Sequence, residues 1–166
     1  MMIQTYQSKL VLKILQSGET YRAKPNLSLK DEYQAMIDLL GLRCECPIFG
    51  VVKGKKQNTG GKVSGSVRLT LDVPDKLVHL TEYSEWADFL YVFQYTRPGH
   101  YRSLRPDCEE ITVRDYNQLL KNLETQKPLS EYKCPQVVLE KIHPAWLKSA
   151  KVMGKGSFFT RLFSRK

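Results

Sequence analysis

The segment PIFGVVKGKKQNTGGKVSGSVRLTLDV, residues 47–73, decides the class of fold that this chain can adopt. It opens with a short apolar run typical of a buried strand. It ends with alternating apolar and polar residues, typical of a strand with one buried face, and the apolar members are Val67, Leu69, Leu71 and Val73. Glycines, lysines and polar residues without any period separate the two runs. The segment therefore predicts a β-hairpin with a flexible basic tip.

Outside this segment the sequence mixes strand and helix patterns. Apolar stretches predict strands at residues 1–6 and 136–142. Helical spacing runs from Ser8 to Gly18, and again from a capping box at Ser28 and Asp31 to Gly41. Two further helix faces consist of Trp86, Phe89, Leu90 and Phe93, and of Tyr116, Leu119, Leu120 and Leu123. Because helices and strands do not strictly alternate, we expect an α+β fold with a mixed or antiparallel sheet and about four helices.

The size and composition of the chain favour one domain. It has 166 residues, of which 42% are hydrophobic and 26% charged, and this composition excludes disordered, collagen-like and membrane-spanning proteins. We place a single domain at residues 1–153 and a basic, aromatic tail at residues 154–166, where phenylalanines and a leucine recur at helical spacing. Three roles stay open for the tail: docking on its own domain, lying on an anionic membrane, or ordering on a partner.

The formal charge of +9 is concentrated in two segments that contain no acidic residue. The first holds Lys53, Lys55, Lys56, Lys62 and Arg68, and the second holds Lys148, Lys151, Lys155, Arg161, Arg165 and Lys166. Subtracting these eleven charges from +9 leaves −2, so the rest of the chain is almost neutral. Localised charge of this kind suits contact with nucleic acid, phospholipid head groups or an acidic protein surface. Charge runs also serve solubility alone, and both interpretations stay open.

A third basic segment, QYTRPGHYRSLRP at residues 94–106, shows no period. Its arginines alternate with tyrosines, and guanidinium forks beside flat aromatic rings suit phosphates and bases. Long aperiodic loops in compact domains are often functional. The candidate contacts to nucleic acid or a partner are therefore Lys53, Lys55, Lys56, Lys62, Arg97, Arg102, Arg105, Lys155, Arg161 and Arg165.

The four cysteines, Cys44, Cys46, Cys108 and Cys134, are too scattered for a disulfide framework, and the first residues lack the apolar run of a signal peptide. We therefore expect a reduced, cytoplasmic protein. The first two cysteines could begin a zinc site with another cysteine or a histidine, but zinc sites favour a wider gap and a second matching pair. We expect inert thiols and no metal.

Two common catalytic arrangements are not matched. A phosphate-binding P-loop needs a leading glycine where this chain has Lys56, a hydroxyl where it has Val63, and a helix where it has a strand pattern. The histidines show no spacing that ties them to a serine or cysteine nucleophile, and they are His79, His100 and His143.

Several short motifs resemble those of an uncharacterised bacterial family, known only as a domain of unknown function. They are IQTYQS at residues 3–8, GETYRA at 18–23, CPIFG at 46–50, DVP at 72–74 and VHLTEYSEW at 78–86. The resemblance covers most of residues 1–125 but not the lysine- and glycine-rich tip. It implies no activity, because the family has none assigned.

The layout is also distantly similar to the ADP-ribosyltransferase-like fold. There a first strand delivers a His or Arg to the NAD ribose, and a late strand presents a catalytic Glu. Here Thr5 and Gln7 occupy the first-strand position and Gln136 the late-strand position. An amide at Gln136 keeps a hydrogen bond but not the charge that stabilises an oxocarbenium-like transition state. Glu140, four residues further on the same face of the predicted strand, is a displaced carboxylate candidate.

Two hypotheses for function follow, and they leave open whether the chain is an enzyme. The resemblance implies a nucleotide-binding domain for NAD or ADP-ribose, weakly catalytic or not catalytic, with a cleft lined by Thr5, Gln7, Tyr21, Arg22 and Gln136. The charge pattern instead favours a non-enzymatic module, of phage or mobile-element origin, that grips nucleic acid or a host protein.

Overall fold

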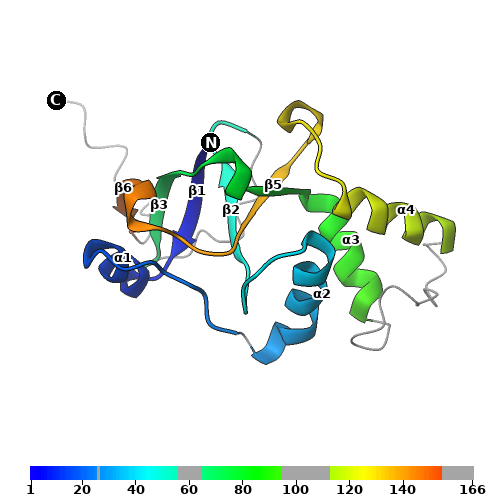
Figure 1. Ribbon diagram of the computed structural model, residues 1–166, viewed down its shortest axis with the longest axis horizontal. Helices are drawn as coiled ribbons and strands as arrows, with labels where there is room; N and C mark the ends of the chain where they lie inside the picture. The colour runs from blue at the N-terminus through cyan, green and yellow to red at the C-terminus, as the bar shows by residue number, and fades with distance from the viewer. Residues whose placement is uncertain (26, 56–64, 95–112, 155–166) are drawn as a thin grey trace.

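A computed structural model describes residues 1–25, 27–55, 65–94 and 113–154 of the chain (Figure 1). Its centre is an open, six-stranded antiparallel sheet with the strand order β4-β5-β2-β1-β3-β6. The strands are β1 (Met2–Gln7), β2 (Ile48–Val52), β3 (Val67–Asp72), β4 (His79–Glu82), β5 (Pro135–Leu139) and β6 (Leu147–Val152). The helices are α1 (Lys9–Gln16), α2 (Lys30–Leu40), α3 (Tyr83–Gln94) and α4 (Val113–Glu124). The prediction of a single α+β domain with about four helices is confirmed.

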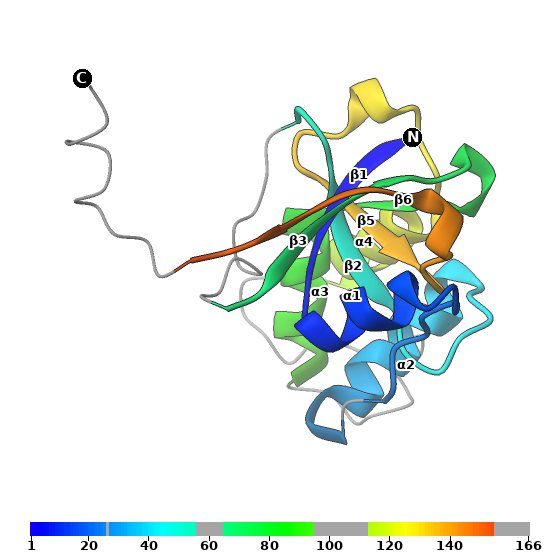
Figure 2. The same cartoon turned by 90° about the vertical axis from the view of Figure 1, so that its left-hand side faces the viewer.

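The predicted β-hairpin is wrong, although both of its strands exist. β1 runs between β2 and β3 and pairs antiparallel with each of them, so that Ile3 stands opposite both Val52 and Leu71 (Figure 2). A two-residue turn would force consecutive strands to pair. The connection from residue 53 to residue 66 is long enough to cross an intervening strand. The alternation of apolar residues predicts where the strands lie but not which strands pair with each other.

The two faces of the sheet bury two separate clusters of apolar side chains. On one face Val138 and Phe49 pack against α2, α3 and α4, which Figure 1 shows gathered on the β5 side of the sheet. On the other face Ile3, Leu71 and Val137 belong to a cluster that includes the buried side of α1. Side chains alternate across a strand, so β5 contributes Val138 to the first cluster and Val137 to the second.

The helices follow their apolar periods, with local corrections. The aromatic stripe of α3 is core as expected: Trp86, Phe89 and Phe93 stack with centroid distances of 5.1 and 5.6 Å. Gly41 ends α2 in the left-handed conformation, with φ of 62°. The predicted capping box is wrong, because Ser28 lies in a 3₁₀ turn that precedes α2, and the N-cap residue of that helix is Leu29, whose side chain makes no capping hydrogen bond.

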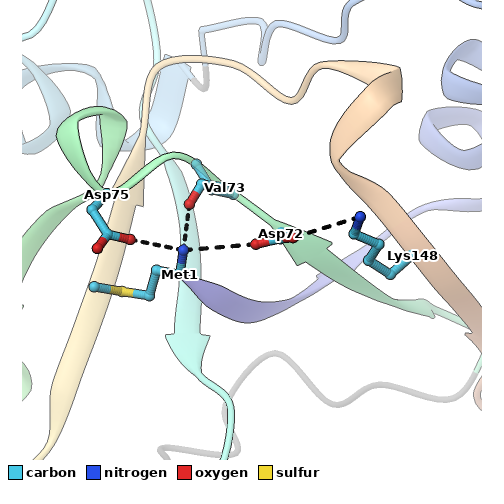
Figure 3. A network of polar contacts seen from close by, with 5 residues as sticks. All are labelled: Met1, Asp72, Val73, Asp75 and Lys148. Carbon is cyan, nitrogen blue, oxygen red and sulfur yellow. Dashed lines mark hydrogen bonds and ion pairs between the residues drawn. The ribbon is translucent and has the colours of Figure 1, made fainter.

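Polar contacts tie the start of β1 to the end of β3 and to β6 (Figure 3). The amino group of Met1 lies 2.8 Å from an Asp75 carboxylate oxygen and 3.8 Å from one of Asp72, and it donates to the Val73 carbonyl. Lys148 of β6 lies 3.5 Å from the second Asp72 oxygen. These exposed or half-exposed charges fix the geometry of this corner more than they add to stability.

Candidate functional site

One row of mostly polar side chains crosses the whole sheet. The strand registers place Thr81, Gln136, Val51, Gln4, Thr70 and Ser149 directly opposite one another, from β4 to β6. Directly paired residues point to the same face, which here is the face covered by α2, α3 and α4 near Val138. Three of the polar members are buried: Thr81 is 2% exposed, Thr70 7% and Gln4 9%. Buried polar groups carry a desolvation cost, so a buried polar row is unusual in a core.

β1 and β2 separate next to this row. Their pairing covers only Ile3 with Val52 and Gln4 with Val51, whereas β1 pairs with β3 over its entire length. Beyond that point the Thr5 hydroxyl donates to the Phe49 carbonyl at 2.6 Å, so a side chain replaces the backbone ladder. The strands therefore leave a gap on the face that carries the polar row.

Gly50 is the small residue that permits this arrangement. A Cβ atom added at Gly50 would lie 2.9 Å from the backbone oxygen of Gln4, which is closer than real Cβ contacts. The close approach of the two backbones therefore requires glycine at this position.

A cavity of about 120 Å³ opens at the separation of the strands. Its polar lining residues include Gln4 and Gln136, and its aromatic lining residues are Tyr6, Phe49 and Tyr83. A cavity of about 150 Å³ is known to hold a benzene ring, so this slightly smaller one holds at most about one aromatic ring. The described residues that line it contain no charged side chain.

The carboxamides retain hydrogen-bonding capacity. Gln136 accepts a 3.1 Å hydrogen bond from the Thr81 hydroxyl through Oε1, and its Nε2 group makes none with a described residue. The carboxamide of Gln4 likewise has no hydrogen bond to any described residue. A carboxamide offers two donors and one acceptor, so the cavity presents neutral groups that match an amide or a heterocyclic ring edge.

Glu82 fixes the rim of the cavity without entering it. Its carboxylate accepts the backbone N–H of Lys133 at 2.7 Å and that of Cys134 at 2.9 Å. These bonds hold the segment that leads into β5, where Cys134 lines the cavity. The carboxylate is thus occupied by backbone donors at the end of β4.

The structure brings together two of the residues predicted for a nucleotide cleft. Thr5 and Gln136 come from β1 and β5, which β2 separates, and both line the cavity. Gln7 lies one step away and donates to the Thr5 hydroxyl at 2.8 Å. Tyr21 and Arg22 lie elsewhere: Tyr21 pairs with Ile142 through its backbone, and Arg22 lines a different cavity.

Glu140 does not reach Gln136. It follows the last residue of β5, and its Oε1 accepts the backbone N–H of Arg43 at 2.9 Å. Four residues along a strand correspond to about 13 Å, so sharing a face does not place two side chains in one site. The carboxylate lines a separate cavity with His79 and Trp146. Burial lowers the pKa of His79, and the charge of Glu140 partly opposes that shift.

Sequence reasoning missed Gln4, Tyr6, Phe49 and Tyr83 as lining residues of this cavity. The available signal was a polar residue at an alternate position of a buried strand, as in Gln4 between Ile3 and Thr5. Such polar residues can be assigned to one row across the sheet only when the strand registers are known.

Few of the predicted basic contacts fall on described residues. Lys53 and Lys55 are exposed just after β2, and Arg68 of β3 stands directly opposite Lys151 of β6. The remaining candidates lie outside the described residues, and these are Lys56, Lys62, Arg97, Arg102, Arg105, Lys155, Arg161 and Arg165. Cys108, His100 and residues 155–166 of the tail also lie outside them.

Two negative findings concern the described residues alone. No three His, Cys, Asp or Glu side chains among them gather as ligands for a metal ion. None of the helices in this part of the chain has the length and apolar character that a membrane crossing requires. Comparison of the chain with family models, with curated proteins and with solved structures found no match.

Proposed function

We propose that the chain is a nucleotide-binding domain of the NAD or ADP-ribose type, with an ADP-ribosyltransferase-like layout and little or no catalysis. One observation carries the proposal: Thr5 and Gln136, from strands that are not neighbours, line one ring-sized cavity. The amide N–H groups of Gln4 and Gln136, which make no hydrogen bond to a described residue, suit the carboxamide of nicotinamide or the edge of adenine. Tyr6, Phe49 and Tyr83 supply apolar and stacking surface.

The size of the cavity limits which part of the ligand it holds. Sites that enclose a drug-sized ligand measure roughly 300–1,000 Å³. The cavity of about 120 Å³ has room for no more than a single ring, so the ribose and phosphates of a dinucleotide would lie outside it. Comparing the affinities for NAD, ADP-ribose and free nicotinamide then shows whether the cavity recognises the nicotinamide ring or the adenine ring.

The lining supports binding better than catalysis. Transfer from NAD needs a negative charge that stabilises the developing positive charge on the ribose. The described lining residues contain no carboxylate, Glu82 is held by backbone N–H groups, and Glu140 lies at the far end of β5. Gln136 keeps a hydrogen-bonding group at the late-strand position but supplies no charge.

Isothermal titration calorimetry with NAD, ADP-ribose and nicotinamide at millimolar concentration tests this function. We expect Gln136→Leu and Gln4→Leu each to weaken binding about fivefold to tenfold, because each removes about one hydrogen bond of roughly 1 kcal/mol. Gln34→Leu is the matched control, since this carboxamide is exposed on α2. Absence of heat with all three ligands, or equal weakening by the control, would contradict the proposal.

A second candidate function is that of a non-enzymatic basic module that contacts nucleic acid or an acidic face of a host protein. The specific observation is that Arg68 and Lys151 stand opposite one another on β3 and β6. Like charges in directly opposed positions are destabilising, and an anion placed between them would relieve that cost. Binding to single-stranded oligonucleotides that weakens steeply with salt, and weakens further in Lys151→Gln, would support this function. Affinity that is insensitive to salt would exclude it.

A further inference from the structure

A second cavity, of about 660 Å³, lies between two loops at the far end of β5. One wall is residues 22–24, which follow α1, and the other is residues 42–45, which join α2 to β2. Three cations, Arg22, Lys24 and Arg43, line it together with a single carboxylate, Glu45. We call this cavity the basic cradle. It shares no lining residue with the cavity at Gln136.

Both walls of the basic cradle are anchored to the residues that follow β5. Tyr21 and Ile142 exchange two backbone hydrogen bonds of 2.9 Å, which fixes the wall next to Arg22. The N–H of Arg43 donates to Glu140 Oε1 at 2.9 Å, which fixes the other wall. Because the two anchors are on the same short segment, the spacing between the walls is set by the fold.

A buried residue and a turn fix the second wall further. Gly41 turns the chain out of α2 in a left-handed conformation, and the N–H of Leu42 donates to the Ile37 carbonyl at 2.9 Å. The Leu42 side chain is buried among the helices, while Arg43 beside it is exposed. The backbone of this wall is therefore fixed, and it carries the exposed side chain of Arg43.

The cations of the basic cradle outnumber the carboxylates near them, which are Glu45 in the lining and Glu140, whose Oε1 accepts the N–H of Arg43. No ion pair joins Arg22, Lys24 or Arg43 to an acidic side chain among the described residues. The charge of Arg22 also acts across the cradle on Cys44 of the opposite wall. Burial raises the pKa of the Cys44 thiol, Glu140 adds to that increase, and Arg22 opposes it.

We propose that the basic cradle binds a phosphate-bearing small molecule. Arginine donates through a planar fork that matches two phosphate oxygens, and two arginines with one lysine suit a multiply charged anion such as a diphosphate. The volume lies within the range of small-ligand sites, and Ala23 adds apolar lining beside the charges. The recognised feature is the phosphate group, whether it is carried by a free diphosphate or by a nucleotide.

Titration calorimetry with inorganic pyrophosphate tests the cradle directly. We expect Arg22→Gln and Arg43→Gln each to weaken binding roughly tenfold, because each removes a charge-assisted contact. Arg114→Gln is the matched control, since this arginine is exposed on α4. We expect the control to bind as the unaltered chain does, and affinity to fall between about 50 mM and about 200 mM salt. No heat at millimolar pyrophosphate, or equal weakening by the control, overturns the proposal.

Two further arms identify the source of the phosphate and separate this site from the ring cavity. Adenosine diphosphate that binds no tighter than pyrophosphate indicates recognition of phosphate alone, and tighter binding that is lost in Arg22→Gln indicates a nucleotide in the cradle. Gln136→Leu should leave pyrophosphate binding unchanged, so failure of one site is distinguishable from failure of the other. If Gln136→Leu weakens pyrophosphate binding as much as Arg22→Gln does, the cradle is not the site.

Cys44 gives a readout at the cradle itself. This thiol is half-buried in the wall, so bound pyrophosphate should slow its alkylation by iodoacetamide, followed by peptide mass spectrometry. Cys134, which lines the other cavity, is the internal control and should react at an unchanged rate. Protection of Cys134 without protection of Cys44 would refute the assignment.

Discussion

The side-chain carboxamide of Gln126 pairs with both backbone groups of Leu80. Its Oε1 accepts the Leu80 N–H at 2.8 Å and its Nε2 donates to the Leu80 carbonyl at 3.1 Å, so it occupies the place of a seventh strand. The Tyr132 hydroxyl also donates to that carbonyl at 3.2 Å. An edge strand with unpaired backbone groups is prone to aggregation, and these side chains close the β4 edge.

Replacing Gln126 with leucine should destabilise the fold. The change leaves the N–H of the buried Leu80 without a partner, which costs about 1–3 kcal/mol of the free energy of unfolding. Urea denaturation followed by circular dichroism measures this loss. The control is Gln118→Ala on the exposed side of α4, which should stay within about 0.5 kcal/mol. Equal stability of the two variants would show that the β4 edge does not depend on Gln126.

Gly50→Ala should destabilise the chain by about 1–3 kcal/mol, since the added methyl group meets the Gln4 carbonyl and the backbones of β1 and β2 must move apart. Gly154→Ala is matched to it, because a Cβ atom there meets nothing within 4 Å. Urea midpoints of the two variants give the comparison. A Gly50→Ala protein as stable as Gly154→Ala would argue against the close approach at the separation of the strands.

The outer edge of β6 should tolerate proline at alternate positions only. The Met153 N–H donates inward to Ser66, so alternation turns the Ser149 N–H inward and the Ala150 N–H outward. Ser149→Pro therefore removes a bond to β3 and should cost about 3 kcal/mol, whereas Ala150→Pro removes none and should cost clearly less. Thermal unfolding of both variants checks the order. The reverse order would indicate a different register for β6.

The free energy of unfolding should fall in mild acid because His79 becomes protonated. Burial lowers its pKa in the folded state below the usual value of 6.5, while the unfolded chain keeps the usual value. The unfolded state then binds more protons, so this contribution is complete above about pH 6.5 and is lost as the pH falls through the folded-state pKa. His79→Gln should show a smaller loss of stability between about pH 7.5 and about pH 5. If the stability of His79→Gln and that of the unaltered protein fall in parallel as the pH is lowered, this prediction is wrong.

The reactivity of Cys44 should respond in opposite directions to two neighbouring substitutions. Its pKa is raised by burial first and by Glu140 second, and Arg22 opposes both. Glu140→Gln should therefore lower the pKa and speed alkylation, since only the thiolate reacts, whereas Arg22→Gln should slow it. Peptide mass spectrometry at about pH 8 resolves Cys44 from the other cysteines. Changes of the same sign in both variants would refute the electrostatic explanation.

The sequence by itself determined the elements that local patterns govern. The stripe of Trp86, Phe89 and Phe93 predicted the buried face of α3, and the alternation of Val67, Leu69 and Leu71 predicted β3. It also determined that Gly41 ends a helix, because a left-handed residue there favours glycine. Each of these follows from interactions within a few residues.

Only the tertiary structure decided which strands are neighbours and which side chains share a cavity. The period of a strand is the same whichever partner it takes, so residues 47–73 indicated a hairpin where β1 in fact inserts. Gln4, Thr70, Thr81 and Gln136 became one row only through four strand registers. Arg22 and Arg43 line the same cavity, the basic cradle, because both loops are anchored after β5. Pairing and anchoring depend on residues far apart in the chain, and local periodicity carries no information about them.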